Sequence, residues 1–526
     1  MRNPSDSTNL EMNTLREMGG VDQEVPSVRV LTILCHPDPG RVGERARLDG
    51  LARGYSVSVS RAEPLFASPS GGESRPLIDP YLSRRPLEIA TESDGRLTLT
   101  PPQADAADLE INGRPLVAPL TIADDSGAVL QLSRRVVLLL HREPLERQPQ
   151  ADLGLLGESH GLELVRRRLL DVAPSTTSVL IRGESGTGKE LVARAIHAHS
   201  ARRTGPFVAV NMGALTPALA MSELFGHVRG AFTDARDSKL GLFAKTDGGT
   251  LFLDEVGQAS AEVQAALLRV LETREIPTVG SDRSRWVDVR ILSATDSNLE
   301  LAIVEGRFSE ALFHRLAAYE IRLPPLRERV DDAARLLVHF LRESLTELGS
   351  IQRMEQPRAG VAPWLPAPLM ARLARYPWPG NVRELRNAAT QIALSSHRDP
   401  RAHIGDELER KIALSEGSRP GIAPGRPNGR EPTETLRPSQ ISGEHLLTAL
   451  QSHDWNLVQV ACELGISRTS LYALIEKYGV GKRVEVPTDE ILRCREECGG
   501  DLDLMTRQLR VSKRALVSWL TQIDRG

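Results

Sequence analysis

The chain has 526 residues but little cysteine and no long apolar run. No stretch of about 18 or more consecutive apolar residues occurs, so the sequence predicts no membrane-spanning helix. The start, Met1 to Ser7, lacks the apolar segment of a secretion signal. The four cysteines suit a reducing compartment, and Cys494 and Cys498 lack the second ligand pair that a zinc site needs. We therefore expect a cytoplasmic protein without a membrane partner.

The chain also lacks an excess of charge of either sign. Sixty-six Lys and Arg stand against 69 Asp and Glu, which gives a formal net charge of −3. A balanced total can hide a local basic patch, so it argues neither for nor against a nucleic-acid partner. The length predicts roughly three to four domains.

The most informative segment is a phosphate-binding loop of the form G-x-x-x-x-G-K. The apolar run 178–182 before it predicts a buried strand, and residues 190–196 after it predict a helix. In that context, backbone N–H groups and a helix N-terminus surround the phosphates, and Lys189 reaches the terminal ones. The residues that we expect to bind ATP here are Gly183, Glu184, Ser185, Gly186, Thr187, Gly188, Lys189 and Glu190.

Two carboxylates follow a second predicted strand, residues 250–253. Open α/β sheets bind ligands at the carboxyl ends of their strands, which is where Asp254 and Glu255 stand. Glu190 occupies the position where most such loops have a Ser or Thr for Mg²⁺, so the metal depends mainly on Asp254. Glu255 then orients and polarises the attacking water. ATP and Mg²⁺ are the expected cofactors.

Six segments occur in one order and spacing: GESGTGKE at 183–190, SELFGHVRGAFTDA at 222–235, GGTLFLDEVG at 248–257, VRILSATDSNL at 289–299, FHRLAAYEIRLPPLRERVDD at 313–332 and YPWPGNVRELRN at 376–387. Together they closely resemble the central domain of sigma-54-dependent transcriptional activators, the bacterial enhancer-binding branch of the AAA+ ATPases. The resemblance implies an α/β AAA+ domain at 152–330 and a helical lid at 331–396. It also implies hydrolysis of ATP to ADP and phosphate by a homo-oligomeric ring, usually hexameric, that remodels sigma-54 RNA polymerase.

The same resemblance implies roles for single residues. Asn211 matches the asparagine that holds the catalytic glutamate, and Arg383 matches the lid arginine that contacts the nucleotide. Arg315 matches an arginine offered to the ATP of the neighbouring subunit, where it neutralises charge on the transferred phosphoryl group. The loop expected to contact sigma-54 consists of Gly230, Ala231, Phe232, Thr233, Asp234 and Ala235.

Three positions depart from the family pattern. Asp234 replaces a glycine, Ser309 replaces a second trans-acting arginine, and Asp296 replaces the usual sensor asparagine. These departures leave a second hypothesis open, a DNA-binding regulator whose ATPase domain is a nucleotide-gated assembly module without sigma-54 remodelling. A different AAA+ machine, such as an unfoldase, is disfavoured by the GAFT loop and by the C-terminal segment described below.

The region before the ATPase predicts a disordered tail at 1–26 and an all-β sandwich at 27–143. Short β-like runs recur between turns, at 28–35, 55–60, 87–90, 97–100, 109–111 and 136–141. Gly43 with Arg45, then LSRRP at 82–86, then ING at 111–113 resemble a forkhead-associated (FHA) domain, which binds phosphothreonine peptides. Ser83, Arg84 and Asn112 match the residues which that family uses on phosphate and peptide. A sandwich that regulates only by packing is the alternative.

The C-terminal region begins with a Pro- and Gly-rich linker at 397–438. Residues 439–482 resemble a Fis-type helix-turn-helix for double-stranded DNA, with contacts expected from Arg468, Thr469, Ser470, Tyr472 and Lys477. Residues 486–524 repeat its apolar pattern and predict a second, divergent helix-turn-helix, a helical tail or a dimerisation hairpin. The sequence as a whole predicts an enhancer-binding activator under phosphothreonine control.

Overall fold

The computed structural model describes residues 26–69, 71–102, 108–123, 127–145, 151–230, 237–277, 284–357 and 361–417, and the single residues 446, 449, 460, 464, 474, 493 and 495. The chain divides into two compact units, residues 1–420 and 421–526. The predicted tail at 1–26, except residue 26, therefore lies outside the described residues. So do the two predicted C-terminal segments at 439–482 and 486–524, apart from these single positions.

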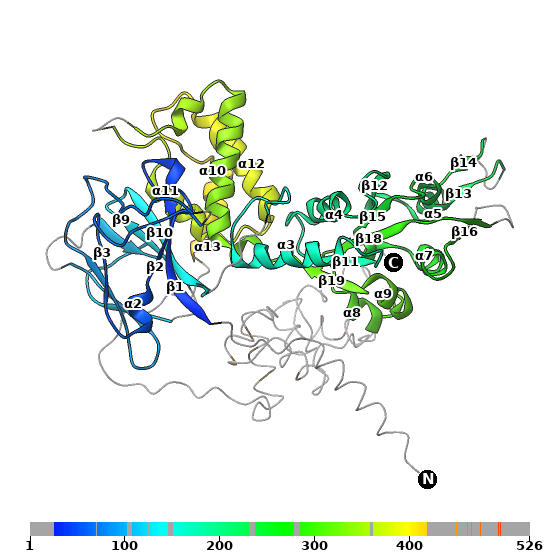
Figure 1. Ribbon diagram of the computed structural model, residues 1–526, viewed down its shortest axis with the longest axis horizontal. Helices are drawn as coiled ribbons and strands as arrows, with labels where there is room; N and C mark the ends of the chain where they lie inside the picture. Colours follow the sequence, from blue (N-terminus) through cyan, green and yellow to red (C-terminus); the bar gives the residue numbers. More distant parts are fainter. Residues whose placement is uncertain are drawn as a thin grey trace, which may run out of the picture. The chain divides into compact units, whose positions relative to one another are not determined.

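Residues 27–144 form two antiparallel sheets with one shared apolar core (Figure 1). The six-stranded sheet has the order β2-β1-β10-β9-β6-β7, and the four-stranded sheet has the order β3-β4-β5-β8. The strands are β1 (Ser27–Cys35), β2 (Arg45–Arg47), β3 (Val57–Val59), β4 (Leu87–Thr91), β5 (Leu97–Thr100), β6 (Leu109–Ile111), β7 (Arg114–Pro115), β8 (Leu120–Ile122), β9 (Ala128–Leu132) and β10 (Val136–Pro144). Two short helices, η1 (Pro39–Arg41) and α2 (Asp49–Ala52), interrupt them.

Strands β9 and β10 are buried on both faces. Because successive side chains of a strand point to opposite faces, Leu138 and Leu140 enter the core between the two sheets, while Val137 and Leu139 point away from it. The outward side chains join an apolar cluster with the lid helices of the ATPase. This sheet is therefore covered on its outer face by the lid.

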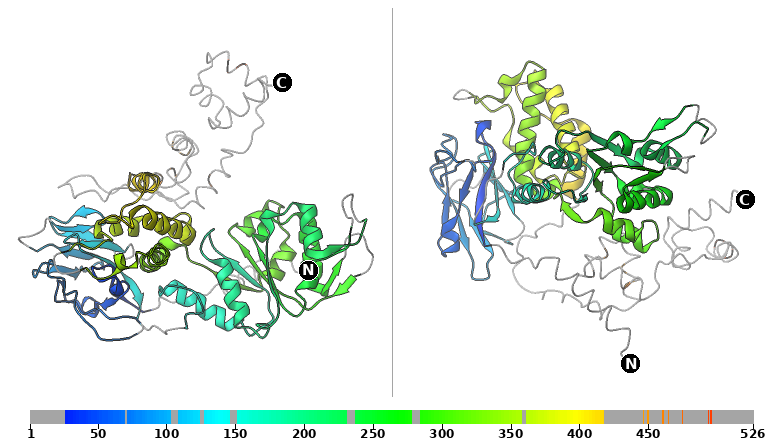
Figure 2. Two further views of the ribbon diagram at one scale, coloured as in Figure 1. Left: turned by 90° about the horizontal axis from the view of Figure 1, so that it is seen from above. Right: turned by 45° about the vertical axis from the view of Figure 1, so that its right-hand side comes forward.

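Residues 155–322 contain a five-stranded parallel sheet of order β12-β15-β18-β11-β19 (Figure 2). Its strands are β11 (Val179–Arg182), β12 (Phe207–Asn211), β15 (Thr250–Asp254), β18 (Arg290–Thr295) and β19 (Tyr319–Arg322). The strands predicted at 178–182 and 250–253 and the helix predicted at 190–196 are confirmed. Apolar clusters lie on both faces of the sheet, as parallel sheets require.

The helices and short hairpins of this domain surround the sheet. They are α3 (His160–Val172), α4 (Lys189–Ala198), η4 (Met212–Ala214), α5 (Pro217–Phe225), α6 (Leu242–Lys245), η5 (Val256–Gln258), α7 (Ala261–Thr273), α8 (Leu299–Val304) and α9 (Glu310–Leu316). Strand pairs β13 (Gly226–His227) with β14 (Lys239–Leu240) and β16 (Glu275–Pro277) with β17 (Ser284–Trp286) form two hairpins.

The lid is helical and longer than the sequence predicts. It contains η6 (Leu326–Glu328), α10 (Val330–Glu347), η7 (Ile351–Met354), α11 (Ala367–Arg375), α12 (Asn381–Ser396) and α13 (Asp406–Gly417). The predicted linker at 397–438 starts too early, because Leu408 and Ile412 of α13 belong to the buried lid cluster. Arg372 of α11 also forms an ion pair with Glu409 of α13 at 2.8 Å. In the part of the chain that the structure describes, no helix has the length and apolar character to cross a membrane.

Candidate nucleotide site

The phosphate loop joins β11 to α4 and depends on two glycines with positive φ. Gly186 has φ 79° and Gly188, which precedes the first residue of α4, has φ 104°. Both angles lie in the region that favours glycine. Lys189 donates from Nζ to the carbonyl oxygens of Gly183 and Glu184 at 2.8 and 3.3 Å, so its ammonium lies inside the loop.

The Lys189 ammonium faces three carboxylates. Burial lowers the pKa of Lys189, and Asp296, Asp254 and Glu255 act in the opposite direction. Asp296, the predicted departure from a sensor asparagine, therefore adds negative charge next to this ammonium. The three carboxylates favour the charged form of Lys189, which is the form that neutralises phosphate oxygens, while burial, the larger effect, lowers its pKa.

Asp254 and Glu255 stand at the end of β15, as predicted. The Glu255 N–H donates to Asp254 Oδ1 at 3.0 Å, and Glu255 has φ 53°, which is rare for a residue other than glycine. Its carboxylate lies over Gly213, where an added Cβ would be 2.3 Å from Glu255 Oε2. A side chain at position 213 would therefore displace the Glu255 carboxylate, which is the end of a flexible side chain, and nothing in the sequence motifs indicated this contact.

Asn211 ends β12 directly beside Asp254 of β15. Its Oδ1 accepts from the Ala214 N–H at 3.2 Å and lies 3.3 Å from the position of a Cβ on Gly213. Asn211 and Glu255 therefore border the same glycine, but among the described residues no hydrogen bond joins them. The predicted hold of Asn211 on Glu255 is not made in this state and stays a prediction.

The donor set at this strand end suits Mg²⁺. Mg²⁺ is usually bound by one or two carboxylates together with phosphate oxygens and water, rather than by a cage of protein ligands. The described residues contain no group of three or more His, Cys, Asp and Glu that could hold a metal, whereas Asp254 offers one carboxylate next to the phosphate loop. Glu190 forms an ion pair with Arg194 at 2.7 Å on the exposed side of α4, and the role of Asp254 as the main Mg²⁺ ligand stays a prediction.

The lid contacts the loop through the start of α12. Arg383 donates to Ser185 Oγ at 3.0 Å, and the Val382 N–H donates to the Gly186 carbonyl at 3.0 Å. The fully buried Asn381 donates from Nδ2 to Glu184 Oε2 and to the Ser185 carbonyl, both at 3.1 Å. The predicted lid arginine therefore meets the predicted phosphate loop.

A second lid residue, Arg327 of η6, forms two hydrogen bonds to the Glu184 carboxylate at 2.8 and 2.7 Å. These bonds lower the pKa of Glu184. Arg327 and Asn381 were not among the predicted site residues. Both lie inside segments quoted above, 313–332 and 376–387, but nothing in those segments indicates that they contact Glu184.

Two predicted subunit-contact positions lie on α9. Arg315 is exposed and pairs with Glu272 of α7 at 3.2 Å. Ser309 is the N-cap of α9, with its Oγ accepting from the Leu312 N–H at 3.3 Å. Its own N–H donates to Gln264 Oε1 at 2.8 Å. Ser309 thus has a local structural role that an arginine cannot fill.

Among the described residues, no hydrogen bond joins Asn112 to Ser83 or Arg84, so the shared phosphopeptide role of these three residues stays a prediction. Ser83 lines a small pocket together with Ser133 and with Asp108, which precedes the start of β6. Asn112 follows the end of the same strand. Three residues of strand separate Leu109 from Asn112 by about 10 Å. Asn112 is used structurally: its Oδ1 accepts from the Val129 N–H at 2.9 Å, and its carbonyl accepts from Arg375 of the lid at 2.7 Å.

Ser83 and Arg84 remain close to each other in the turn before β4. Ser83 Oγ accepts from the Arg85 N–H at 3.0 Å, and Arg84 is exposed. Other predicted contact residues lie outside the described residues: positions 231–235 of the sigma-54 loop, of which only Gly230 is described, and the predicted DNA contacts at 468, 469, 470, 472 and 477.

Comparison with known proteins identifies three segments of the chain. Residues 155–322 match the sigma-54 interaction domain, residues 327–416 match the AAA+ ATPase lid domain, and residues 438–478 match the bacterial regulatory protein Fis family. The lid match ends at residue 416, close to the end of α13 at Gly417, whereas the sequence predicted that the lid ends at 396.

Several curated proteins are similar over half to about three quarters of their length. The transcriptional regulatory protein ZraR of Klebsiella oxytoca is 38% identical over 339 residues, which are 64% of this chain and 72% of that protein. The anaerobic nitric oxide reductase transcription regulator NorR of Salmonella enteritidis is 38% identical over 409 residues, 75% of this chain and 77% of that protein. The DNA-binding transcriptional regulator NtrC of Klebsiella pneumoniae is 48% identical over 246 residues, 47% of this chain and 50% of that protein.

Among solved structures, NtrX from Brucella abortus in complex with ATP is 33% identical, with a TM-score of 0.43, and the match covers 62% of this chain and 70% of that chain. The first two matched segments, 155–322 and 327–416, coincide with the parallel-sheet domain and the lid described above. The chain belongs to the sigma-54-dependent AAA+ transcriptional regulators.

Proposed function

We propose that this regulator binds upstream DNA through its C-terminal segment and uses ATP hydrolysis to remodel sigma-54 RNA polymerase, so that the promoter opens. The observation that carries the proposal is the convergence of Lys189, Asp254, Glu255 and Arg383 around one phosphate loop. Together these groups supply a cation for the phosphates, a carboxylate for Mg²⁺, a base for water and a lid contact.

In the proposed reaction, Lys189 neutralises the terminal phosphates and Glu255 orients the attacking water. When bound at Asp254, Mg²⁺ would neutralise charge on the phosphate oxygens. Most catalysis of phosphoryl transfer comes from such positioning and charge stabilisation. Arg383 moves with the lid and contacts Ser185 of the loop, so closure of the lid would bring its guanidinium to the nucleotide.

The proposed assembly is a hexameric ring, in which Arg315 reaches the ATP of the neighbouring subunit. Its exposed position on α9 and its exchangeable, solvent-exposed partner Glu272 support this role. Surface ion pairs of this kind contribute little stability, so breaking the Arg315–Glu272 pair on assembly costs little. Hydrolysis would then depend on assembly.

We also propose that the β-sandwich binds a phosphothreonine peptide at the turn that holds Ser83 and Arg84, without Asn112. An exposed arginine next to a serine hydroxyl suits a dianionic phosphate. Arg84→Ala should abolish binding of a phosphothreonine peptide library, while Arg96→Ala, an exposed arginine of the same sandwich, should leave binding unchanged. Equal binding by both variants would overturn this part of the proposal.

The activator function is tested by transcription from a sigma-54 promoter in a purified system. The proposal predicts transcripts from the wild-type chain with ATP, and none without ATP or from Asp254→Ala. Transcripts from Asp254→Ala would show that ATP hydrolysis at this site is not required.

A further inference from the structure

The β-sandwich and the ATPase lid meet at a buried cluster of charged side chains centred on Arg45 of β2. Arg45 forms an ion pair with Glu143 of β10 at 2.9 Å and with Asp331 of α10 at 2.9 Å. It also donates to the carbonyl of Glu158, in the segment before α3, at 3.0 Å. The side chains of Arg45, Glu143 and Asp331 are only 6–7% exposed, so one guanidinium joins three parts of the chain away from water.

The cluster continues to the phosphate loop through the neighbouring residue of α10. Asp332 accepts from the N–H groups of Glu158 and Ser159 at 2.6 and 2.9 Å. Asp332 also faces Arg329 at 3.9 Å, and Arg329 donates to the carbonyl of Thr187 in the phosphate loop at 3.4 Å. A continuous path of buried polar contacts thus runs from the sandwich to the nucleotide site.

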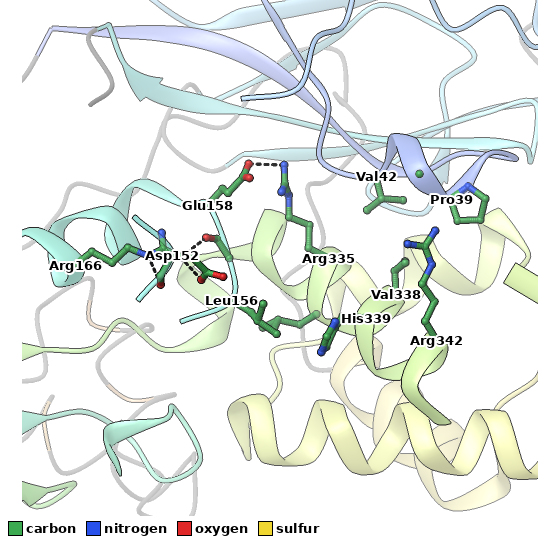
Figure 3. Close-up of a pocket in the computed structure, with 13 residues that line it drawn as sticks. Pro39, Val42, Asp152, Leu156, Glu158, Arg166, Arg335, Val338, His339 and Arg342 are labelled. Atoms are coloured by element: carbon green, nitrogen blue, oxygen red, sulfur yellow. Dashed lines mark hydrogen bonds and ion pairs between the residues drawn. The ribbon is translucent and has the colours of Figure 1, made fainter. Parts of the chain in front are cut away.

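A second contact between the sandwich and the lid lies beside the first. Arg335 of α10 donates to the Gly43 carbonyl at 2.8 Å. It also forms an ion pair with Glu158 at 2.6 Å (Figure 3). A side chain at Gly43 would collide with Arg335, because an added Cβ would lie 2.0 Å from its Nε. Next to these contacts is a cavity of about 420 Å³, bordered by Pro39 and Val42 of the sandwich, the segment 152–158 and α10. The junction is therefore polar and incompletely filled.

Beside this polar junction lies an apolar contact. Cys35, Val137 and Leu139 of the sandwich share one buried cluster with Leu337 and Trp364 of the lid. Apolar contacts of this kind hold the two parts together but are non-directional, so they select no single geometry by themselves. A buried ion pair tolerates less, since losing one partner leaves an uncompensated charge that typically costs about 3–5 kcal/mol. The Arg45 cluster is therefore the part of the junction that defines where α10 lies.

We propose that Arg45 is a positioning residue for the ATPase, through which the β-sandwich sets the position of lid helix α10 and thereby the affinity for nucleotide. The inference rests on the proposed nucleotide site and goes beyond it, because it assigns a role in nucleotide binding to a residue of the sandwich. A residue outside the site changes affinity only if it contributes differently to the bound and free states. The contacts of Asp331, Asp332 and Arg329 are the route by which a shift of α10 would reach the phosphate loop.

The test measures binding of a fluorescent ATP analogue to the full chain. Arg45→Gln should weaken binding at least about tenfold, within the range of typical coupling between sites. Arg335→Ala, at a partly exposed contact with a smaller risk to folding, should weaken it about threefold or more. The matched control is Arg47→Gln in the same strand, whose exposed ion pair is with Asp49 of the sandwich and not with a lid residue. Equal affinities for wild type, Arg45→Gln and Arg335→Ala, with unfolding temperatures unchanged, would overturn the proposal.

Coupling between two sites is reciprocal, which gives a second measurement. Cys35 is fully buried at the sandwich–lid contact, and burial raises the pKa of its thiol to about 12. With Cys462, Cys494 and Cys498 replaced by Ser, the rate of Cys35 modification by a thiol reagent reports opening of this contact. A non-hydrolysable ATP analogue should slow the reaction in the wild-type background and not in Arg45→Gln. An unchanged rate in the wild-type background would contradict the coupling.

The two measurements separate this inference from the proposed function. Failure of the wild-type chain to bind the ATP analogue would remove the nucleotide site itself. Normal binding by wild type together with normal binding by Arg45→Gln would remove only the role of Arg45.

Discussion

Glu184 of the phosphate loop and Arg327 of the lid face each other with two hydrogen bonds of 2.7 and 2.8 Å. Asn381 adds a third bond to the same carboxylate at 3.1 Å. The glutamate that follows the first glycine of the loop therefore has its side chain turned to the lid, so the loop and the lid are held together by protein groups.

This relationship predicts that Arg327→Ala raises the KM for ATP, by about threefold, while the unfolding temperature changes little. The pair is nearly half exposed, and exposed ion pairs contribute only about 0–1 kcal/mol to stability. The charge exchange Glu184→Arg with Arg327→Glu should restore part of the affinity. Lys411→Gln, which breaks an exposed pair with Glu407 on α13, is the control. A KM equal to that of wild type in Arg327→Ala would contradict the prediction.

Asn381 should matter more for stability. It is fully buried, has φ 51°, and its Oδ1 accepts from the Leu326 N–H at 2.8 Å in addition to its two donated bonds. Asn381→Ala should lower the free energy of unfolding by about 2–4 kcal/mol, because the Leu326 N–H and the Ser185 carbonyl lose their hydrogen-bond partner. Asn381→Gly should lose about 1 kcal/mol less, because glycine accepts the positive φ. Denaturant unfolding measures both, and equal stability of Asn381→Ala and wild type would refute the role of these bonds.

Gly213→Ala should slow hydrolysis without weakening nucleotide binding. The new methyl group would displace the Glu255 carboxylate, whose Oε2 lies 2.3 Å from its position. Loss of a positioned general base typically lowers kcat by about 10²–10⁴-fold. Gly405→Ala, where an added Cβ meets no atom within 4 Å, is the control. A kcat within about twofold of wild type in Gly213→Ala would show that Glu255 is not the group that activates water.

Stability should fall as the pH rises from about 4.5 to 7. Burial raises the pKa of Glu143 to about 7 from its ordinary value of 4.5, and burial raises that of Asp332 to about 6. A carboxyl whose pKa is higher in the folded state stabilises the fold while protonated, and this contribution is lost as the pH passes through the folded pKa. For Glu143 the loss amounts to about 3 kcal/mol at most.

The pH dependence of wild-type stability alone does not isolate Glu143, because neighbouring groups titrate over the same pH range. Burial lowers the pKa of His141, which acts in the opposite direction, so that its contribution grows as the pH rises. The difference between wild type and Glu143→Gln isolates Glu143, and chemical denaturation across the window from about pH 4.5 to 8 measures it. A difference that does not change with pH would contradict the raised pKa.

The nucleotide site was predictable because its chemistry depends on short segments. The glycines of 183–188, Lys189 and the strand that ends in Asp254 are parts of local motifs, and in the fold they follow the strand–loop–helix order that the motif predicts. Arg327 and Asn381 were visible in the motifs, but their partner Glu184 is more than 140 residues away, and nothing local connects them.

The junction between sandwich and lid was harder to predict. The uninterrupted apolar run 136–140 is a signal that β10 is buried on both faces, but it does not say what covers the second face. Arg45 and Asn112 fit an FHA-like pattern in the sequence, whereas in the fold both bind the lid. Each of them contacts a lid residue more than 250 positions later in the chain, and the spacing of residues within a motif does not predict a contact of that kind.

Promoter opening by sigma-54 RNA polymerase tests the central claim most directly. Base unpairing, followed by a fluorescent base analogue in the melted region, should appear with the wild-type chain and ATP, and should be absent with Asp254→Ala. Hydrolysis of ATP by wild type without unpairing would contradict the activator account. In that case Asp234→Gly, which restores the family residue in the sigma-54 loop, would be compared next, and the nucleotide-gated assembly module would replace the remodelling machine.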